Sequence, residues 1–149
     1  RLKPGRTVKA IFTGVEELGL WGACAYADKH ASELPNMKGV IAFDSIGNPF
    51  DSMFQLMTTA EIRPFASEIV GELGYADAKY EVELRPGGDH APFQMKGVPC
   101  VWLAGGILTI FYHTSKDDPE LLSYDRLKLF SDIDGEIAYR LATDKSLPF

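Results

Sequence analysis

Four residues of this sequence carry side chains suited to metal binding and proton transfer. Glu16 and Glu17 are adjacent, while Asp44 and His113 lie far from them along the chain. Glutamate, aspartate and histidine are the ligand set of a catalytic zinc or a related cation. One of two neighbouring carboxylates can bind a metal while the other accepts a proton from water that the metal activates. The positive charge of the metal would offset the repulsion between the two glutamates.

The glutamate pair also has a purely structural interpretation. Residues 12–30, FTGVEELGLWGACAYADKH, pass from an apolar run into an expected helix. Negative side chains at a helix N-terminus are favoured by the helix dipole, by a few tenths to about 1 kcal/mol. Residue types and spacing alone leave both interpretations open.

Three apolar runs are expected to form buried strands, and each leads to one of these residues. The runs are TVKAIFTG (7–14), KGVIAFDS (38–45) and VPCVWLAGG (98–106). The glutamate pair follows the first run, Asp44 ends the second, and His113 ends the apolar segment after the third. In open α/β sheets, ligands bind in the crevice outside the carboxyl ends of the strands. The four residues can therefore converge despite their separation in sequence.

The rest of the sequence predicts helices that alternate with further strands. The helix after Glu17 is expected to bury an apolar stripe of Leu18, Leu20, Trp21, Ala25 and Tyr26. Other expected elements are strands at 53–59 and 79–85, helices at 61–75 and 123–144, and a glycine loop with a short helix at 86–97. This alternation predicts an α/β fold, layered α/β/α around a mixed, largely parallel sheet. Residues 1–149 are expected to form a single domain.

Four ordered blocks extend across most of the chain: FTGVEELGLWGACAYADKH, VIAFDSIG, GGDHAPFQMKGVPCVWL and YHTSKDDPE. Together they resemble the zinc aminopeptidases of peptidase family M28. A glutamate pair alone would be a weak match, whereas four blocks in the family's order are specific. The resemblance implies the zinc-exopeptidase fold and an enzyme that removes amino-terminal residues from peptides.

Carried over residue by residue, the resemblance assigns a role to each candidate. It implies that Glu16 is the general base, that Glu17 binds one zinc and Asp44 the other, and that His113 is a further metal ligand. Which ion each ligand binds stays open. Tyr112 matches a tyrosine that stabilises the oxyanion in some relatives. In an extended segment Tyr112 and His113 would point to opposite sides, so Tyr112 could equally be a core aromatic residue.

Three further polar residues fall in the matching blocks. Asp117 is expected either to hold a ligand or loop in place by hydrogen bonds or to be a turn residue. Asp89 and His90 match the family's Asp-His pair, although Asp89 could instead cap the helix that begins at Ala91. His90 is expected at most to support a metal ligand from behind.

The sequence lacks part of the family's ligand set. Members of the family carry a further histidine and a metal-bridging aspartate upstream of the double glutamate, and the complete site holds two zinc ions. This sequence begins too late to contain those segments. It is expected to be the carboxyl-terminal portion of a metallopeptidase catalytic domain, to be completed by another chain, or no longer to catalyse. The isolated chain is expected to be inactive and, through exposed strand edges, prone to self-association.

Two other functions are compatible with the same residues. Glutaminyl cyclases share the fold and a similar ligand set, but they use one zinc and do not hydrolyse their substrate. A non-catalytic interaction domain of the same fold is the third possibility. The intact glutamate pair, Asp44 and His113 argue against that possibility, and the absent upstream ligands argue for it.

Composition and charge narrow the classes of partner. The formal net charge is −6 and the pI is near 5.0, with lysine and arginine scattered along the chain. This gives no electrostatic basis for binding nucleic acid. No apolar run reaches the roughly 18 residues that a membrane span needs. The expected partner is a peptide substrate, and the resemblance favours an exported protein, periplasmic or extracellular.

Overall fold

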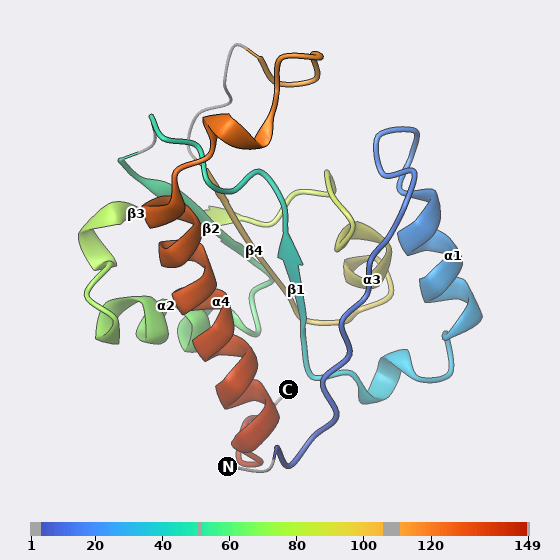
Figure 1. The fold of residues 1–149 in the computed structure, drawn as a ribbon. Helices are drawn as coiled ribbons and strands as arrows, with labels where there is room; N and C mark the ends of the chain where they lie inside the picture. The colour runs from blue at the N-terminus through green and yellow to red at the C-terminus, as the bar shows by residue number, and fades with distance from the viewer. Residues whose placement is uncertain (1–3, 51, 106–110, 149) are drawn as a thin grey trace.

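A computed structural model describes residues 4–50, 52–105 and 111–148 of the chain. Figure 1 shows helices on both sides of a twisted sheet. The strands are β1 (Val40–Phe43), β2 (Phe54–Thr58), β3 (Lys79–Glu83) and β4 (Cys100–Gly105). The α-helices are α1 (Trp21–Lys29), α2 (Arg63–Glu72), α3 (Ala91–Gln94) and α4 (Tyr124–Thr143). Single 3-10 turns occupy η1 (Leu34–Asn36), η2 (Ala76–Ala78) and η3 (Pro119–Leu121).

The described strands form one mixed sheet in the order β1-β4-β2-β3. β1 runs parallel to β4, with Phe43 opposite Leu103, and β2 runs parallel to β3. Only the central pair, β2 and β4, is antiparallel. The sheet is therefore mixed and mostly parallel, as the sequence predicts. Because β1 and β4 are parallel, their carboxyl ends meet at one edge, which is where Asp44 follows β1.

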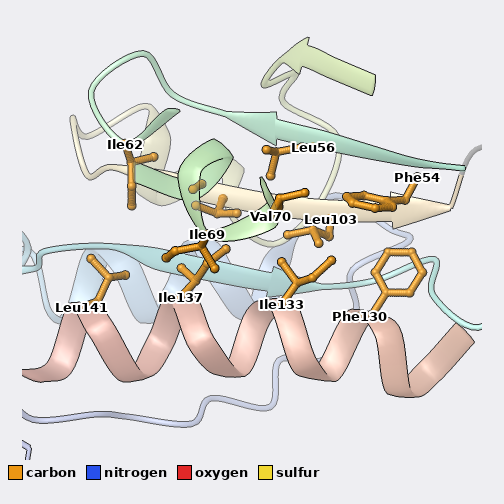
Figure 2. Packing of buried hydrophobic residues seen from close by; sticks show 12 residues of the cluster. Phe54, Leu56, Ile62, Ile69, Val70, Leu103, Phe130, Ile133, Ile137 and Leu141 are labelled. Carbon is orange, nitrogen blue, oxygen red and sulfur yellow. The ribbon is translucent and has the colours of Figure 1, made fainter. Parts of the chain in front are cut away.

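One face of the sheet is covered by α2 and α4 (Figure 1). Helix α4 begins after Ser123, whose hydroxyl oxygen accepts a hydrogen bond from the amide of Arg126 at 3.3 Å. Figure 2 shows the apolar side of α4 packed toward β2, β4 and α2. The buried residues of this cluster include Phe54, Leu56, Ile69, Val70, Val101, Leu103, Phe130, Ile133, Ile137 and Leu141. The predicted helix at residues 123–144 is confirmed, and its buried apolar residues recur at the spacing of one helix side.

The opposite face of the sheet is covered by α1 and α3. Residues alternate across β4, so that Val101 and Leu103 face the first cluster, whereas Cys100 and Ala104 face the second. The second cluster also contains Ala23, Ala27, Met57, Phe93 and Val98. Helices on both faces confirm the predicted α/β/α layering. No helix of the described ranges is long and apolar enough to cross a lipid bilayer.

The predicted buried strand at residues 7–14 is not formed. The structure describes this whole segment and assigns it neither helix nor strand, and Phe12 is 98% exposed. A strand needs a neighbouring backbone to pair with, and β propensity alone does not supply one. Instead, the segment is held at its ends. Arg6 Nη1 donates to the carbonyl oxygen of Leu141 at 2.6 Å, and the amide of Gly22 donates to the carbonyl of Gly14 at 3.0 Å.

The predicted apolar stripe of α1 is wrong for Leu18, Trp21 and Ala25, which are exposed. Leu18 precedes the helix and is 78% exposed, and Trp21 is 67% exposed. The buried positions of α1 are Ala23 and Ala27. Small side chains allow α1 to pack closely over α3, and Tyr26, which is half-buried, packs against the same cluster. Helix α1 therefore fixes the corner that carries the glutamate pair through small buried residues.

Candidate metal centre

A tight turn before α1 holds the two glutamates. The backbone carbonyl of Glu16 accepts hydrogen bonds from the amides of Gly19 at 3.0 Å and Leu20 at 2.8 Å. Val15 and Leu20 both have a φ of 59°, which is uncommon for residues with a side chain. A Cβ on Gly22 would stand 2.6 Å from the carbonyl oxygen of Gly14, so only glycine permits this close approach. The turn leaves Glu16 half-buried and Glu17 exposed.

Asp44 stands at the end of β1, as predicted. The indole Nε1 of Trp102, on β4, donates to the backbone carbonyl of Asp44 at 3.3 Å. The chain then turns at Ser45, whose φ is 54° and whose carbonyl accepts from the amide of Gly105 at 2.9 Å. These bonds tie the end of β1 to the end of β4. Sequence reasoning missed Trp102, because nothing in an apolar strand pattern marks which aromatic residue anchors a neighbouring backbone.

His113 and Glu17 are in contact although 96 residues separate them. The Nε2 of His113 lies 2.6 Å from Oε1 of Glu17, and both side chains are more than half exposed. The apolar run before His113 includes residues 106–110, which lie outside the described residues, so the strand end predicted there is not tested. The contact brings together two of the predicted metal ligands.

The rings of Tyr112 and His113 lie side by side. Their centroids are 3.8 Å apart and the planes meet at 23°. His113 has a φ of 61°, so the segment is a turn and is not extended. The alternation of side chains in an extended strand therefore does not apply here. Tyr112 is on the same side as His113, beside the glutamates.

Acidic side chains from several segments shift the pKa values of Glu16 and Tyr112. Burial, and then the negative charges of Glu17, Asp44 and Asp89, raise the pKa of Glu16 above its usual value, while His113 opposes this shift. Burial likewise raises the pKa of the Tyr112 phenol, and Glu17, Asp44, Glu16 and Asp117 add to the effect. A cation bound in this region would relieve the repulsion among the carboxylates.

The donor types fit zinc, but the ligand sphere is incomplete. Two ligands of one tetrahedral zinc stand about 3.3 Å apart, so the contact between Glu17 and His113 needs to open by less than about 1 Å to admit an ion. Within the described ranges, no three histidine, cysteine, aspartate or glutamate side chains are grouped closely enough to hold a metal. The described residues therefore offer a pair of ligands in contact, with Asp44 nearby.

The remaining candidates lie behind or beside this cluster. Asp89 does not cap α3, because the cap position is His90 and no side chain bonds there. The hydroxyl of Thr13 instead donates to Oδ2 of Asp89, which ties the segment before the glutamates to the glycine loop. Asp117 lies in a turn, where its amide donates to the carbonyl of Thr114 at 3.1 Å. His90 is fully buried, and its ring centroid lies 5.0 Å from that of Trp102.

Comparisons with known proteins agree with this fold and show the family of the chain. The profile of peptidase family M28 matches residues 1–138. Leupeptin-inactivating enzyme 1 of Streptomyces exfoliatus is 31% identical over 106 residues, which make up 70% of this chain and 24% of that protein.

Two solved structures illustrate the similarity of fold. BSAP, a zinc aminopeptidase from Bacillus subtilis, matches 90% of this chain and 36% of its own, with a TM-score of 0.80 and 23% identity. A glutaminyl cyclase from an Acidobacteriales bacterium matches 83% of this chain and 46% of its own, with a TM-score of 0.64 and 20% identity. The chain thus spans less than half the length of each of these relatives. Because the family profile matches most of the chain, this chain belongs to peptidase family M28.

Proposed function

We propose that this chain is the carboxyl-terminal portion of the catalytic domain of a zinc-dependent aminopeptidase. The observation that carries the proposal is the contact between Glu17 and His113, next to Glu16 with its raised pKa, in a chain of a peptidase family. The likeness to a protein described as a zinc aminopeptidase supports the choice of metal and reaction. The substrate is a peptide with a free amino terminus.

The metal ligands in this proposal are Glu17, His113 and Asp44. Glu17 and His113 share one zinc, because they already touch, and Asp44 binds a second zinc. Residues outside this chain complete both sites. When bound, zinc polarises the scissile carbonyl and makes water nucleophilic near neutral pH.

Glu16 and Tyr112 perform the proton transfer and charge stabilisation. Glu16 accepts a proton from the attacking water and returns it to the leaving amine. Its raised pKa suits this task, since a base must both take up and release a proton. The raised pKa of Tyr112 keeps the phenol protonated, so it can donate a hydrogen bond to the developing oxyanion.

The direct test uses the full-length protein and an aminoacyl-anilide. We expect release of the free amine, loss of turnover on dialysis against a chelator, and recovery when zinc is restored. Turnover that survives complete removal of the metal would refute the proposal.

Glutaminyl cyclase activity is the second candidate, because a glutaminyl cyclase is among the similar structures. The same preparation is given a peptide with amino-terminal glutamine. Formation of the cyclised peptide, without release of a free amino acid, would favour the cyclase. A protein that binds zinc but carries out neither reaction would favour a non-catalytic interaction domain.

Replacing Glu17 by glutamine should weaken zinc binding in the full-length protein by at least about tenfold. Glutamine keeps the shape of the glutamate side chain but lacks its negative charge. Zinc affinity should fall because a metal binds a deprotonated, charged donor more tightly. Zinc affinity is measured by competition with a chelator. Glu68→Gln, at an exposed position of α2, is the matched control and should bind zinc as the wild type does. Equal affinity in both variants would remove Glu17 from the ligand set.

The isolated 149-residue chain should bind zinc weakly or not at all and should show no aminopeptidase activity. A catalytic zinc usually needs three protein ligands on one ion, whereas here three ligands are divided between two ions roughly 3.5–4 Å apart. Metal analysis after dialysis, with the anilide assay, provides the measurement. Stoichiometric zinc and turnover from a monomer of this chain would show that its own residues suffice.

A further inference from the structure

A pocket of about 200 Å³ lies at the end of β4 that is far from the candidate metal centre. It is lined by Thr58, at the end of β2, and by Val98, just before β4. Strands β2 and β4 are antiparallel, with Thr58 opposite Val101 and Phe54 opposite Gly105. The six residues of β4 therefore separate the pocket from the strand end near the metal centre by roughly 17 Å. The pocket is a different site.

A half-buried arginine, Arg63, forms one wall of the pocket. It is the first residue of α2. Its Nε donates to Oγ1 of Thr58 at 3.2 Å, and its Nη2 donates to the backbone carbonyl of Thr58 at 3.4 Å. Because Thr58 is fully buried, these bonds fix the orientation of the guanidinium. They use the edge formed by Nε and Nη2, and the outer edge, formed by Nη1 and Nη2, has no partner among the described residues.

Two carboxylates line the same pocket without pairing with this arginine. Glu61 and Glu83 are exposed, and within the described ranges neither side chain takes part in an ion pair or a hydrogen bond. The charge of Arg63 also acts on Glu81, but that carboxylate is already paired with Lys79 at 2.6 Å. The pocket therefore offers a positive group and two negative groups that are all available to a ligand.

This lining favours a small zwitterion with an apolar body. A lone anion would be attracted by Arg63 and repelled by the two carboxylates, whereas a molecule with a carboxylate and an ammonium matches both signs. The outer edge of a guanidinium binds a carboxylate through two parallel hydrogen bonds. Leu84 and Val98, which are both buried, supply apolar surface in the pocket. Pockets for drug-sized ligands measure roughly 300–1,000 Å³, so this smaller pocket suits a smaller molecule.

We propose that this pocket binds a free α-amino acid with an apolar side chain, such as leucine. The carboxylate of the ligand bonds to the outer edge of Arg63, and its ammonium lies against Glu61 and Glu83. Its side chain contacts Leu84 and Val98. The inference does not depend on a metal or on peptidase activity. In the proposed function such amino acids are products, so the pocket holds product at a place apart from the metal centre.

Four ligands test this chemistry by isothermal titration calorimetry on the full-length protein. Leucine should bind. Leucinamide lacks the carboxylate and N-acetyl-leucine lacks the ammonium, so each should bind at least about tenfold more weakly. Inorganic phosphate, a lone anion, should not bind. Absence of leucine binding, or affinity for N-acetyl-leucine or phosphate equal to that for leucine, would overturn the proposal.

Substitutions of the arginine locate the bound leucine. Arg63→Gln should bind leucine at least about tenfold more weakly than the wild type. Arg63→Lys keeps the charge but loses the paired hydrogen bonds, so its affinity should lie between the two. Arg85→Gln is the matched control, because it makes the same change in charge at an exposed position outside the pocket lining. Wild-type affinity in folded Arg63→Gln, or an equal loss in Arg85→Gln, would overturn the proposal.

A comparison with and without metal separates this pocket from the metal centre. The titration with leucine is repeated after dialysis against a chelator, with thermal unfolding to check the fold, and the affinity should be unchanged. Leucine binding that disappears with the metal from folded protein would place the ligand at the metal centre and overturn the proposal. Since no titration measures turnover, loss of the proposed function would leave these results standing.

Discussion

Replacing Glu16 by glutamine should lower the turnover of the full-length protein by about 10²–10⁴-fold while zinc content stays near wild type. Glutamine keeps the shape of the side chain but cannot accept the proton of the attacking water. Glu16 is half-buried beside Glu17 and carries a raised pKa, whereas Glu17 is the member of the pair in contact with His113. The loss should therefore appear in kcat and leave metal binding intact.

Glu17→Gln is the control that shows which glutamate binds the metal and which acts as the base. Zinc content and kcat are measured for both variants in the same preparation. Glu16→Gln should lose turnover and keep zinc, while Glu17→Gln should lose zinc and turnover together. The reverse pattern would mean that the two roles are exchanged. Turnover near wild type in Glu16→Gln, with zinc bound, would exclude Glu16 as the base.

Local patterns predicted the elements whose partners lie within the chain. Helix α4 and strands β1 to β4 lie within their predicted ranges, because an apolar stripe or run is enough to define them once a sheet exists. Asp44 was placed correctly for the same reason, since it follows an apolar run directly. Residues 7–14 have an equally strong apolar pattern and form no strand. Their apolar pattern shows only that these residues favour the strand conformation. A strand also needs a neighbouring strand to pair with, and a local pattern does not supply one.

The geometry at Tyr112 and His113 could not be predicted from the sequence. A positive φ is uncommon for residues other than glycine, and no glycine marks the turn at His113. The stacking of the two rings and the contact with Glu17 follow from that turn. Residue types were therefore enough to select His113, but its partner and orientation needed the fold.

One buried residue of α4 was missed although its spacing marks it. Asp134 lies four residues after Phe130 and three before Ile137, which are the intervals of the buried face of a helix. It is fully buried, and neither carboxylate oxygen has a hydrogen-bond partner within the described residues. Burial raises the pKa of Asp134 from 3.8 to about 8. The folded chain therefore holds this carboxyl in its neutral form at physiological pH.

This pKa shift makes the stability of the chain fall as pH rises. In the unfolded chain Asp134 loses its proton near its ordinary pKa of 3.8, whereas in the folded chain it keeps the proton up to about pH 8. Between these values the folded state binds more protons than the unfolded state, so the free energy of unfolding decreases with pH. The slope is about 1.4 kcal/mol per pH unit for one proton, and the whole effect is on the order of 5 kcal/mol.

Replacing Asp134 by asparagine should remove this pH dependence and stabilise the chain most strongly near pH 8. Asparagine is nearly isosteric with aspartic acid and cannot ionise. The folded and unfolded states of the variant therefore bind the same number of protons at this position. Urea unfolding at pH 5, 6, 7 and 8 gives the free energy of unfolding for each variant.

Asp132→Asn is the control, because Asp132 lies on the same helix but pairs at the surface with Lys128. It should keep the slope of the wild type, since removing a surface ion pair changes stability by at most about 1 kcal/mol. If Asp134→Asn and Asp132→Asn show the same slope as the wild type, Asp134 is ionised or partnered in the folded chain, and the buried neutral carboxyl is refuted.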